Sequence, residues 1–115
     1  MPAGPPICIA TANFDIAEML TDFLEPHGWT VYRLTGADLA DPALTDRCGL
    51  MLCDVDLPPF RVAAVGALGR PVVYFSSSRQ RQEVVVPPDG VAFLQLPIAW
   101  PALEALLRSL GTTPQ

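Results

Sequence analysis

The chain has 115 residues, of which 50% are hydrophobic and 17% charged, and its formal net charge is -5. This length suits one domain with its own core, and the composition excludes a largely disordered chain. The seven basic residues are all arginines, scattered along the chain, so no basic patch for direct binding of nucleic acid is expected. No apolar run approaches the ~20 residues of a membrane span, so no membrane contact is expected.

In the first half of the chain, two apolar strands alternate with two helical segments. Apolar side chains recur every three to four residues over 16–24, which predicts an amphipathic helix, and Asp15 and Glu18 have the spacing of a capping box near its start. A Pro-His-Gly sequence then ends this helix. The other elements expected here are strands over 7–10 and 29–34 and a short, irregular helix over 38–46.

In the second half, three further strands are expected over 49–53, 71–75 and 91–94. A helix over 60–68 is weakened by its glycines, and Pro101 opens a last helix at its first position. The segment 77–90 is expected to hold a reduced or broken helix. Its three valines, 84–86, either form an exposed apolar surface or fold back onto the sheet.

Five continuous apolar strands that alternate with helices predict a parallel sheet covered on both faces, a three-layer α/β/α sandwich. The expected topology is flavodoxin-like, with strand order 2-1-3-4-5 and shortened or irregular third and fourth helices. One domain over 7–110 is expected between a proline-rich tail, 1–6, and a C-terminal tail, 111–115. In this fold, ligands and chemistry lie at the carboxyl ends of the strands.

Cysteine and histidine give little catalytic signal. Cys8, Cys48 and Cys53 are odd in number and lack ligand spacing. Cys8 and Cys53 lie in apolar runs on neighbouring strands, where core thiols are expected and a redox pair is the alternative. No signal peptide is visible at the N-terminus, and a reducing cytoplasm is the simplest compartment. His27 is expected to be exposed in a turn, and a single histidine excludes a multi-histidine metal site.

Four sequence pieces, in this order and spacing, resemble the receiver domain of bacterial two-component response regulators (CheY-like domains). Residues 15–20 are similar to the start of the family's first helix, and 54–58, Asp-Val-Asp-Leu-Pro, to the end of its phospho-acceptor strand. Residues 71–76 are similar to the strand that ends in a Ser/Thr switch. Leu96-Pro97 falls where the family has Lys-Pro, usually with a cis peptide bond. The resemblance covers residues 7–110.

This resemblance implies a mechanism for a working receiver. Two acidic residues after the first strand help to hold Mg²⁺, and the aspartate, here Asp54, accepts a phosphoryl group from a histidine kinase. The lysine neutralises the phosphoryl oxygens, and the hydroxyl of the switch residue, here Ser76, turns toward them. A carboxylate that attacks an anionic group needs such cations nearby. The resemblance also implies a cis-proline at Pro97.

The sequence departs from the family pattern at the positions that supply these cations. Thr11 and Ala12 replace the acidic pair, and Asn13 is the next polar residue. Leu96 replaces the lysine, and the chain contains no other lysine. Mg²⁺ prefers carboxylates and waters, so neither Mg²⁺ binding nor any other metal or cofactor is expected. Asp54 and Ser76 are therefore interpreted as a vestigial phospho-acceptor and a vestigial switch.

The sequence thus predicts a pseudo-receiver: a non-enzymatic, phosphorylation-independent signalling module that contacts a protein partner or a second copy of itself. It is expected to be either a stand-alone protein or part of a larger regulator or hybrid kinase. One alternative is a weakly phosphorylatable receiver that uses Asp54, and another is a flavodoxin-like domain that binds a small molecule. The candidates for the interaction face are Val91, Phe93, Leu103 and Leu107.

Overall fold

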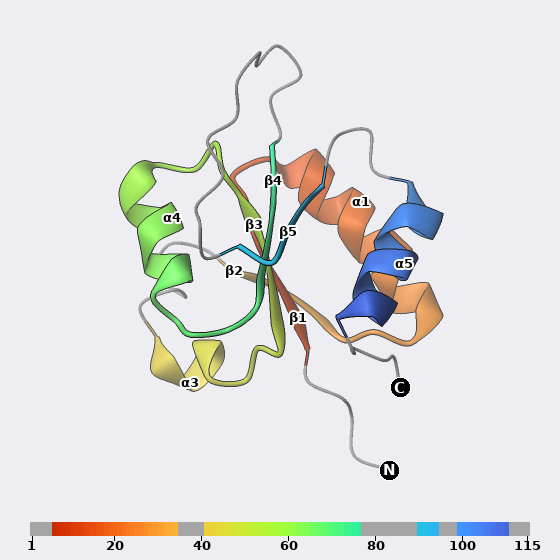
Figure 1. The fold of residues 1–115 in the computed structure, drawn as a ribbon, viewed down its shortest axis with the longest axis horizontal. Helices are drawn as coiled ribbons and strands as arrows, with labels where there is room; N and C mark the ends of the chain where they lie inside the picture. The colour runs from red at the N-terminus through yellow and green to blue at the C-terminus, as the bar shows by residue number, and fades with distance from the viewer. Residues whose placement is uncertain (1–5, 35–40, 77–89, 95–98, 111–115) are drawn as a thin grey trace.

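A computed structural model describes residues 6–34, 41–76, 90–94 and 99–110 of the chain. Its sheet has five parallel strands in the order β2-β1-β3-β4-β5 (Figure 1), which confirms the predicted α/β fold and strand order. The strands are β1 (Ile7–Ala10), β2 (Val31–Leu34), β3 (Leu50–Asp54), β4 (Val72–Phe75) and β5 (Ala92–Leu94).

Helices cover both faces of the sheet (Figure 1). α1 and α5 pack on one face, and α3 and α4 lie on the other. Because β1, β3 and β4 are covered on both sides, every residue in them is buried, which is why they read as continuous apolar runs. The helical elements are α1 (Phe14–Leu24), the 3₁₀ helix η1 (Glu25–His27), α3 (Pro42–Thr45), α4 (Pro59–Gly66) and α5 (Trp100–Ser109).

Two apolar layers, one on each face of the sheet, form the core. The layer under α1 and α5 takes one set of alternating strand residues, and the layer under α4 takes the other set. The fully buried strand residues of the first layer are Ile7, Ile9, Leu50, Leu52, Val73 and Phe75, and those of the second are Cys8, Ala10, Met51, Cys53, Val72 and Tyr74.

The start of α1 corrects one prediction. Asn13 is the N-cap, and its side-chain oxygen accepts a hydrogen bond of 3.2 Å from the backbone N–H of Ile16. The capping box expected from Asp15 and Glu18 is wrong, because α1 begins at Phe14 and Asp15 already lies in its first turn. α1 ends at Leu24, and the 3₁₀ helix η1 that follows it ends at the predicted Pro-His-Gly sequence, where Gly28 is the C-cap with a φ of 93°, in the left-handed region that favours glycine.

The other helices agree in part with the predicted ones. α4 has eight residues and ends at Gly66, so the helix after β3 is short, as expected. His27 is exposed, as predicted, and its ring stacks on Trp100 at the start of α5, with 4.1 Å between ring centroids. The predictions for 77–89 lie outside the described residues. None of the helices in the described part of the chain is long and apolar enough to cross a membrane.

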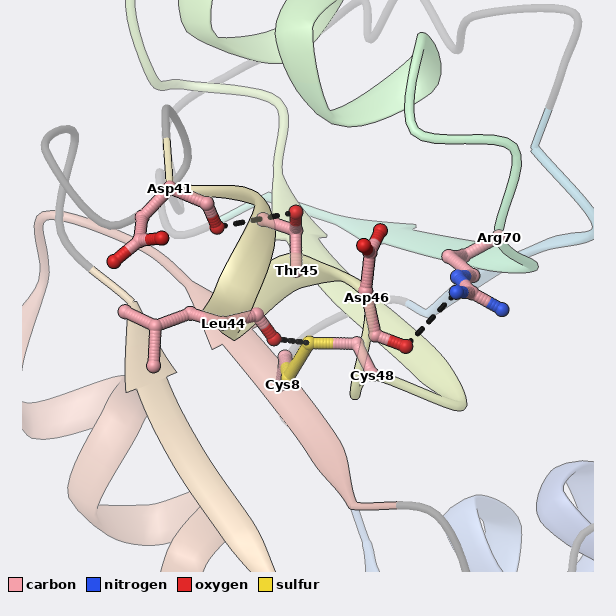
Figure 2. Close-up of a disulfide and its surroundings, with 7 residues drawn as sticks. All are labelled: Cys8, Asp41, Leu44, Thr45, Asp46, Cys48 and Arg70. Atoms are coloured by element: carbon pink, nitrogen blue, oxygen red, sulfur yellow. Dashed lines mark hydrogen bonds between the residues drawn. A yellow bond between two sulfur atoms is a disulfide. The ribbon is translucent and has the colours of Figure 1, made fainter.

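A disulfide joins Cys8 on β1 to Cys48, which precedes β3, with 5.9 Å between their Cα atoms (Figure 2). This corrects the expectation that Cys8 is a core thiol or pairs with Cys53, which is a buried thiol outside the disulfide. Cys8 lies opposite Met51 in the parallel register, so Cys53 is two residues further along β3. A bridge between residues 40 positions apart stabilises a fold by roughly 4 kcal/mol in the chain-entropy model.

Truncation of a buried leucine of α5 tests which side chains stabilise the core. Leu103 is 0% exposed and Val91 is 49% exposed. We predict that Leu103→Ala lowers the free energy of unfolding by about 2–5 kcal/mol, because it leaves a cavity between α5 and the sheet. Val91→Ala is the matched control and should change it by about 0.5 kcal/mol or less. Urea unfolding followed by circular dichroism measures both; equal effects would contradict the assignment.

Candidate functional site

The strand register brings three polar residues to one edge of the sheet. Ala10 lies opposite Cys53, and Asp54 lies opposite Phe75. Thr11 follows β1, Asp54 ends β3, and Ser76 follows β4. Because β1, β3 and β4 are adjacent and parallel, these residues meet at the carboxyl ends of the strands, where α/β folds place their sites.

Both carboxylate oxygens of Asp54 accept hydrogen bonds. The hydroxyl of Thr11 donates to Oδ2 over 2.7 Å, and the backbone N–H of Asp56 donates to Oδ1 over 2.9 Å. Asp54 is only 2% exposed, and a buried carboxylate without such donors is strongly unfavourable. Two neutral donors, the Thr11 hydroxyl after β1 and the Asp56 backbone N–H after β3, therefore stabilise the buried carboxylate of Asp54.

Thr11 is held in position from the opposite side. Its hydroxyl oxygen accepts the backbone N–H of Asn13 over 3.0 Å, which leaves the hydroxyl proton for Asp54. The side-chain oxygen of Asn13 is engaged as the N-cap of α1. Ala12 is exposed and brings no polar side-chain atom to the edge. The two positions where the resemblance implies an acidic pair thus hold one hydrogen-bond donor and one methyl group.

Ser76 contacts the second aspartate of the edge. Its hydroxyl donates to Oδ2 of Asp56 over 2.6 Å, and Ser76 is 7% exposed. Asp56 is exposed, but its carboxylate links the loop after β3 to the end of β4. The sequence did not predict the contact between Ser76 and Asp56. The one feature of the sequence that could have indicated it is that the two residues follow adjacent strands, β4 and β3.

The structure places the remaining predicted residues as follows. Leu96 and Pro97 lie outside the described residues, so the lysine position and the cis-proline stay predictions. Among the described residues, no three His, Cys, Asp or Glu side chains are grouped so that they could hold a metal ion. The acidic residues that meet at this edge are Asp54 and Asp56, both within the hydrogen-bond network above.

The candidate interaction face divides into two parts. Leu103 and Leu107 are 0% and 1% exposed and pack into the core under α1 and α5, so they are not available at the surface. Their assignment to the interaction face is therefore wrong, because their helical spacing belongs to the side of α5 that is buried against the sheet. Val91 is exposed and Phe93 is half-buried at β5, the last strand of the described sheet, so this part of the face remains accessible.

Comparison with known proteins defines the fold. No protein-family model and no curated protein matches the sequence. A CheY-like receiver domain from Methylobacillus flagellatus is 20% identical with a TM-score of 0.71, over 94% of this chain and 99% of that one. The N-terminal domain of the nisin resistance regulator NsrR, a lantibiotic response regulator, is 24% identical with a TM-score of 0.72, over 90% and 95%.

A third similar structure is the N-terminal domain of a response regulator/sensory box/GGDEF three-domain protein from Carboxydothermus hydrogenoformans. It is 17% identical with a TM-score of 0.72, and the match covers 90% of this chain and 91% of that one. These matches extend along nearly the whole of each domain. The chain therefore has the CheY-like receiver fold, and Asp54 ends β3 of this fold.

Removal of the Thr11 hydroxyl tests its role as the donor to Asp54. We predict that Thr11→Val, which keeps the shape of the side chain, lowers the free energy of unfolding by about 1–3 kcal/mol, because it leaves a buried carboxylate oxygen without its donor. Thr11→Ser retains the hydroxyl and should keep most of the stability. Denaturant unfolding at neutral pH measures both variants; equal stability of the Val and Ser variants would show that the bond is not stabilising.

Proposed function

We propose that this domain is a pseudo-receiver: a signalling module that keeps the receiver fold and acts without phosphorylation, through contact with a protein partner or a second copy of itself. It is a non-enzymatic module of the two-component type, located in the cytoplasm. The observation that carries this proposal is the occupied carboxylate of Asp54, since each of its oxygens accepts a hydrogen bond.

These hydrogen bonds oppose the use of Asp54 as a nucleophile. An oxygen that attacks phosphorus must give up its donor and become accessible, and Asp54 is only 2% exposed. Hydrogen bonds to an ionised acceptor are about twice as strong as neutral ones, so the Thr11 bond is costly to break. Thr11 therefore stabilises the unmodified aspartate at a position where the resemblance implies a ligand for Mg²⁺.

The charge at the edge also opposes a phosphorylated state. A phosphoryl group on Asp54 would add negative charge next to a second acidic residue, Asp56, whose backbone N–H contacts Asp54. In phosphoryl transfer, metal ions and cationic side chains neutralise such charge, but this sequence has no lysine and lacks the acidic pair. The balance of charge thus favours the unmodified domain.

The contact of Ser76 supports a single resting conformation. Its hydroxyl already donates to Asp56, so the loop after β3 is linked to the end of β4 without any phosphoryl group. In the implied family mechanism, this hydroxyl turns when the phosphoryl group arrives. In this domain, signalling would depend on a surface that a partner protein or a second copy recognises. The accessible part of the expected interaction face is the region of Val91 and Phe93.

Incubation with acetyl phosphate and Mg²⁺ tests the proposal directly. We expect the intact mass of the protein to remain unchanged, since Asp54 keeps its hydrogen bonds and no lysine is present to receive the phosphoryl oxygens. A receiver domain with a complete acidic pair and lysine, treated in parallel, shows that the reaction works. A phosphorylated species in the wild-type protein that is absent from Asp54→Asn would overturn the proposal in favour of a weakly active receiver.

A further inference from the structure

We propose that Cys8 and Cys48 form a redox-responsive clamp on α3, so that the thiol–disulfide balance around the protein controls how firmly this helix is held to the sheet. The proposal concerns the side of the sheet covered by α3 and α4, and it does not depend on the function proposed for the Asp54 edge. The ligand class is a small thiol or disulfide.

The element that the clamp holds cannot be stable by itself. α3 has four residues, and isolated helices of that length do not persist in water. Besides the burial of Thr45, two links hold the segment after α3 (Figure 2): Arg70 donates to the backbone oxygen of Asp46 over 2.9 Å, and the disulfide joins Cys48 to Cys8 on the interior strand β1. Reduction removes the covalent link and leaves the hydrogen bond from an exposed arginine and the burial of Thr45 and Cys48.

The fold can accommodate the reduced state as well as the oxidised one. Sγ of Cys48 lies 3.6 Å from the backbone oxygen of Leu44, and a thiol S–H at that position can donate to it, whereas a disulfide sulfur has no proton to donate (Figure 2). Cys8 lies in the apolar layer with Ala10 and Met51, a suitable environment for a neutral thiol. The two states therefore differ mainly in whether the turn after α3 is covalently attached to β1.

The position of each sulfur indicates the order of the exchange reaction. Cys48 lies in a turn next to α3, whereas Cys8 lies on β1, which is paired on both sides by β2 and β3. After α3 opens, a thiolate of a small dithiol attacks Sγ of Cys48 and forms a mixed disulfide, and the Cys8 thiolate leaves and takes a proton. The second thiol of the reagent then displaces Cys48, so the reagent becomes a disulfide and the protein gains two thiols.

Cys53 is not an alternative partner for Cys8. The register places Cys53 two residues beyond the position opposite Cys8, so their Cα atoms are separated by about 8 Å, one strand spacing across and two residues along. A disulfide needs Cα atoms within about 7 Å. Cys53 therefore remains a thiol in both states and supplies an internal control.

Mass mapping and hydrogen exchange of the full chain test the clamp. After equilibration with oxidised glutathione, we expect a Cys8–Cys48 cross-linked peptide and a single thiol, that of Cys53, and after treatment with a dithiol, three thiols. On reduction, backbone amides over 43–48 should exchange faster by on the order of tenfold or more, because α3 opens more often. Amides in α5 should keep their exchange rates.

Two variants separate a local clamp from a disulfide that stabilises the whole fold. Cys48→Ser should show fast exchange over 43–48 without reductant and no response to a dithiol, whereas Cys53→Ala should respond as the wild type does. The proposal is overturned if no Cys8–Cys48 bridge forms in the oxidising buffer. It is also overturned if reduction leaves exchange over 43–48 unchanged, or accelerates α5 and the central strands equally, which would indicate general stabilisation.

Discussion

The hydrogen bond from the Thr11 hydroxyl to Oδ2 of Asp54 is the interaction on which the functional edge of this domain depends. It joins the ends of β1 and β3 and stabilises a carboxylate that is almost entirely buried. Without a donor at this position, the negative charge would need a metal ion or a cationic side chain. In the pseudo-receiver that we propose, this one neutral side chain takes the place of an ionic centre.

The remaining polar contacts extend this bond across the edge of the sheet. The Asp56 backbone binds Asp54, and the Asp56 side chain accepts from Ser76, so β1, β3 and β4 are connected through one chain of hydrogen bonds. Such a network is worth more as a unit than its separate pairs. In the proposed pseudo-receiver, this network would hold the ends of β1, β3 and β4 in one conformation.

The sequence predicts the sheet well because β1, β3 and β4 are buried on both faces and need uninterrupted apolar residues. The predicted strand order also places Thr11 and Asp54 at the ends of adjacent strands, but it does not predict the hydrogen bond between them. It does not predict the Cys8–Cys48 bridge, because an odd number of cysteines and their spacing carry no information on which sulfurs approach each other. Helical spacing likewise identified one side of α5 without showing that Leu103 faces the core.

The nuclear magnetic resonance signal of the Asp56 backbone amide, whose N–H donates to Asp54, reports whether that carboxylate stays engaged. Mg²⁺ and beryllofluoride, a mimic of a phosphoryl group, are added to the ¹⁵N-labelled protein. If Asp54 is permanently engaged by Thr11 and Asp56, the Asp56 signal keeps its position throughout the titration. A saturable shift of this signal that disappears in Asp54→Asn would show that the carboxylate exchanges its hydrogen bonds for the ligand, and would contradict a pseudo-receiver.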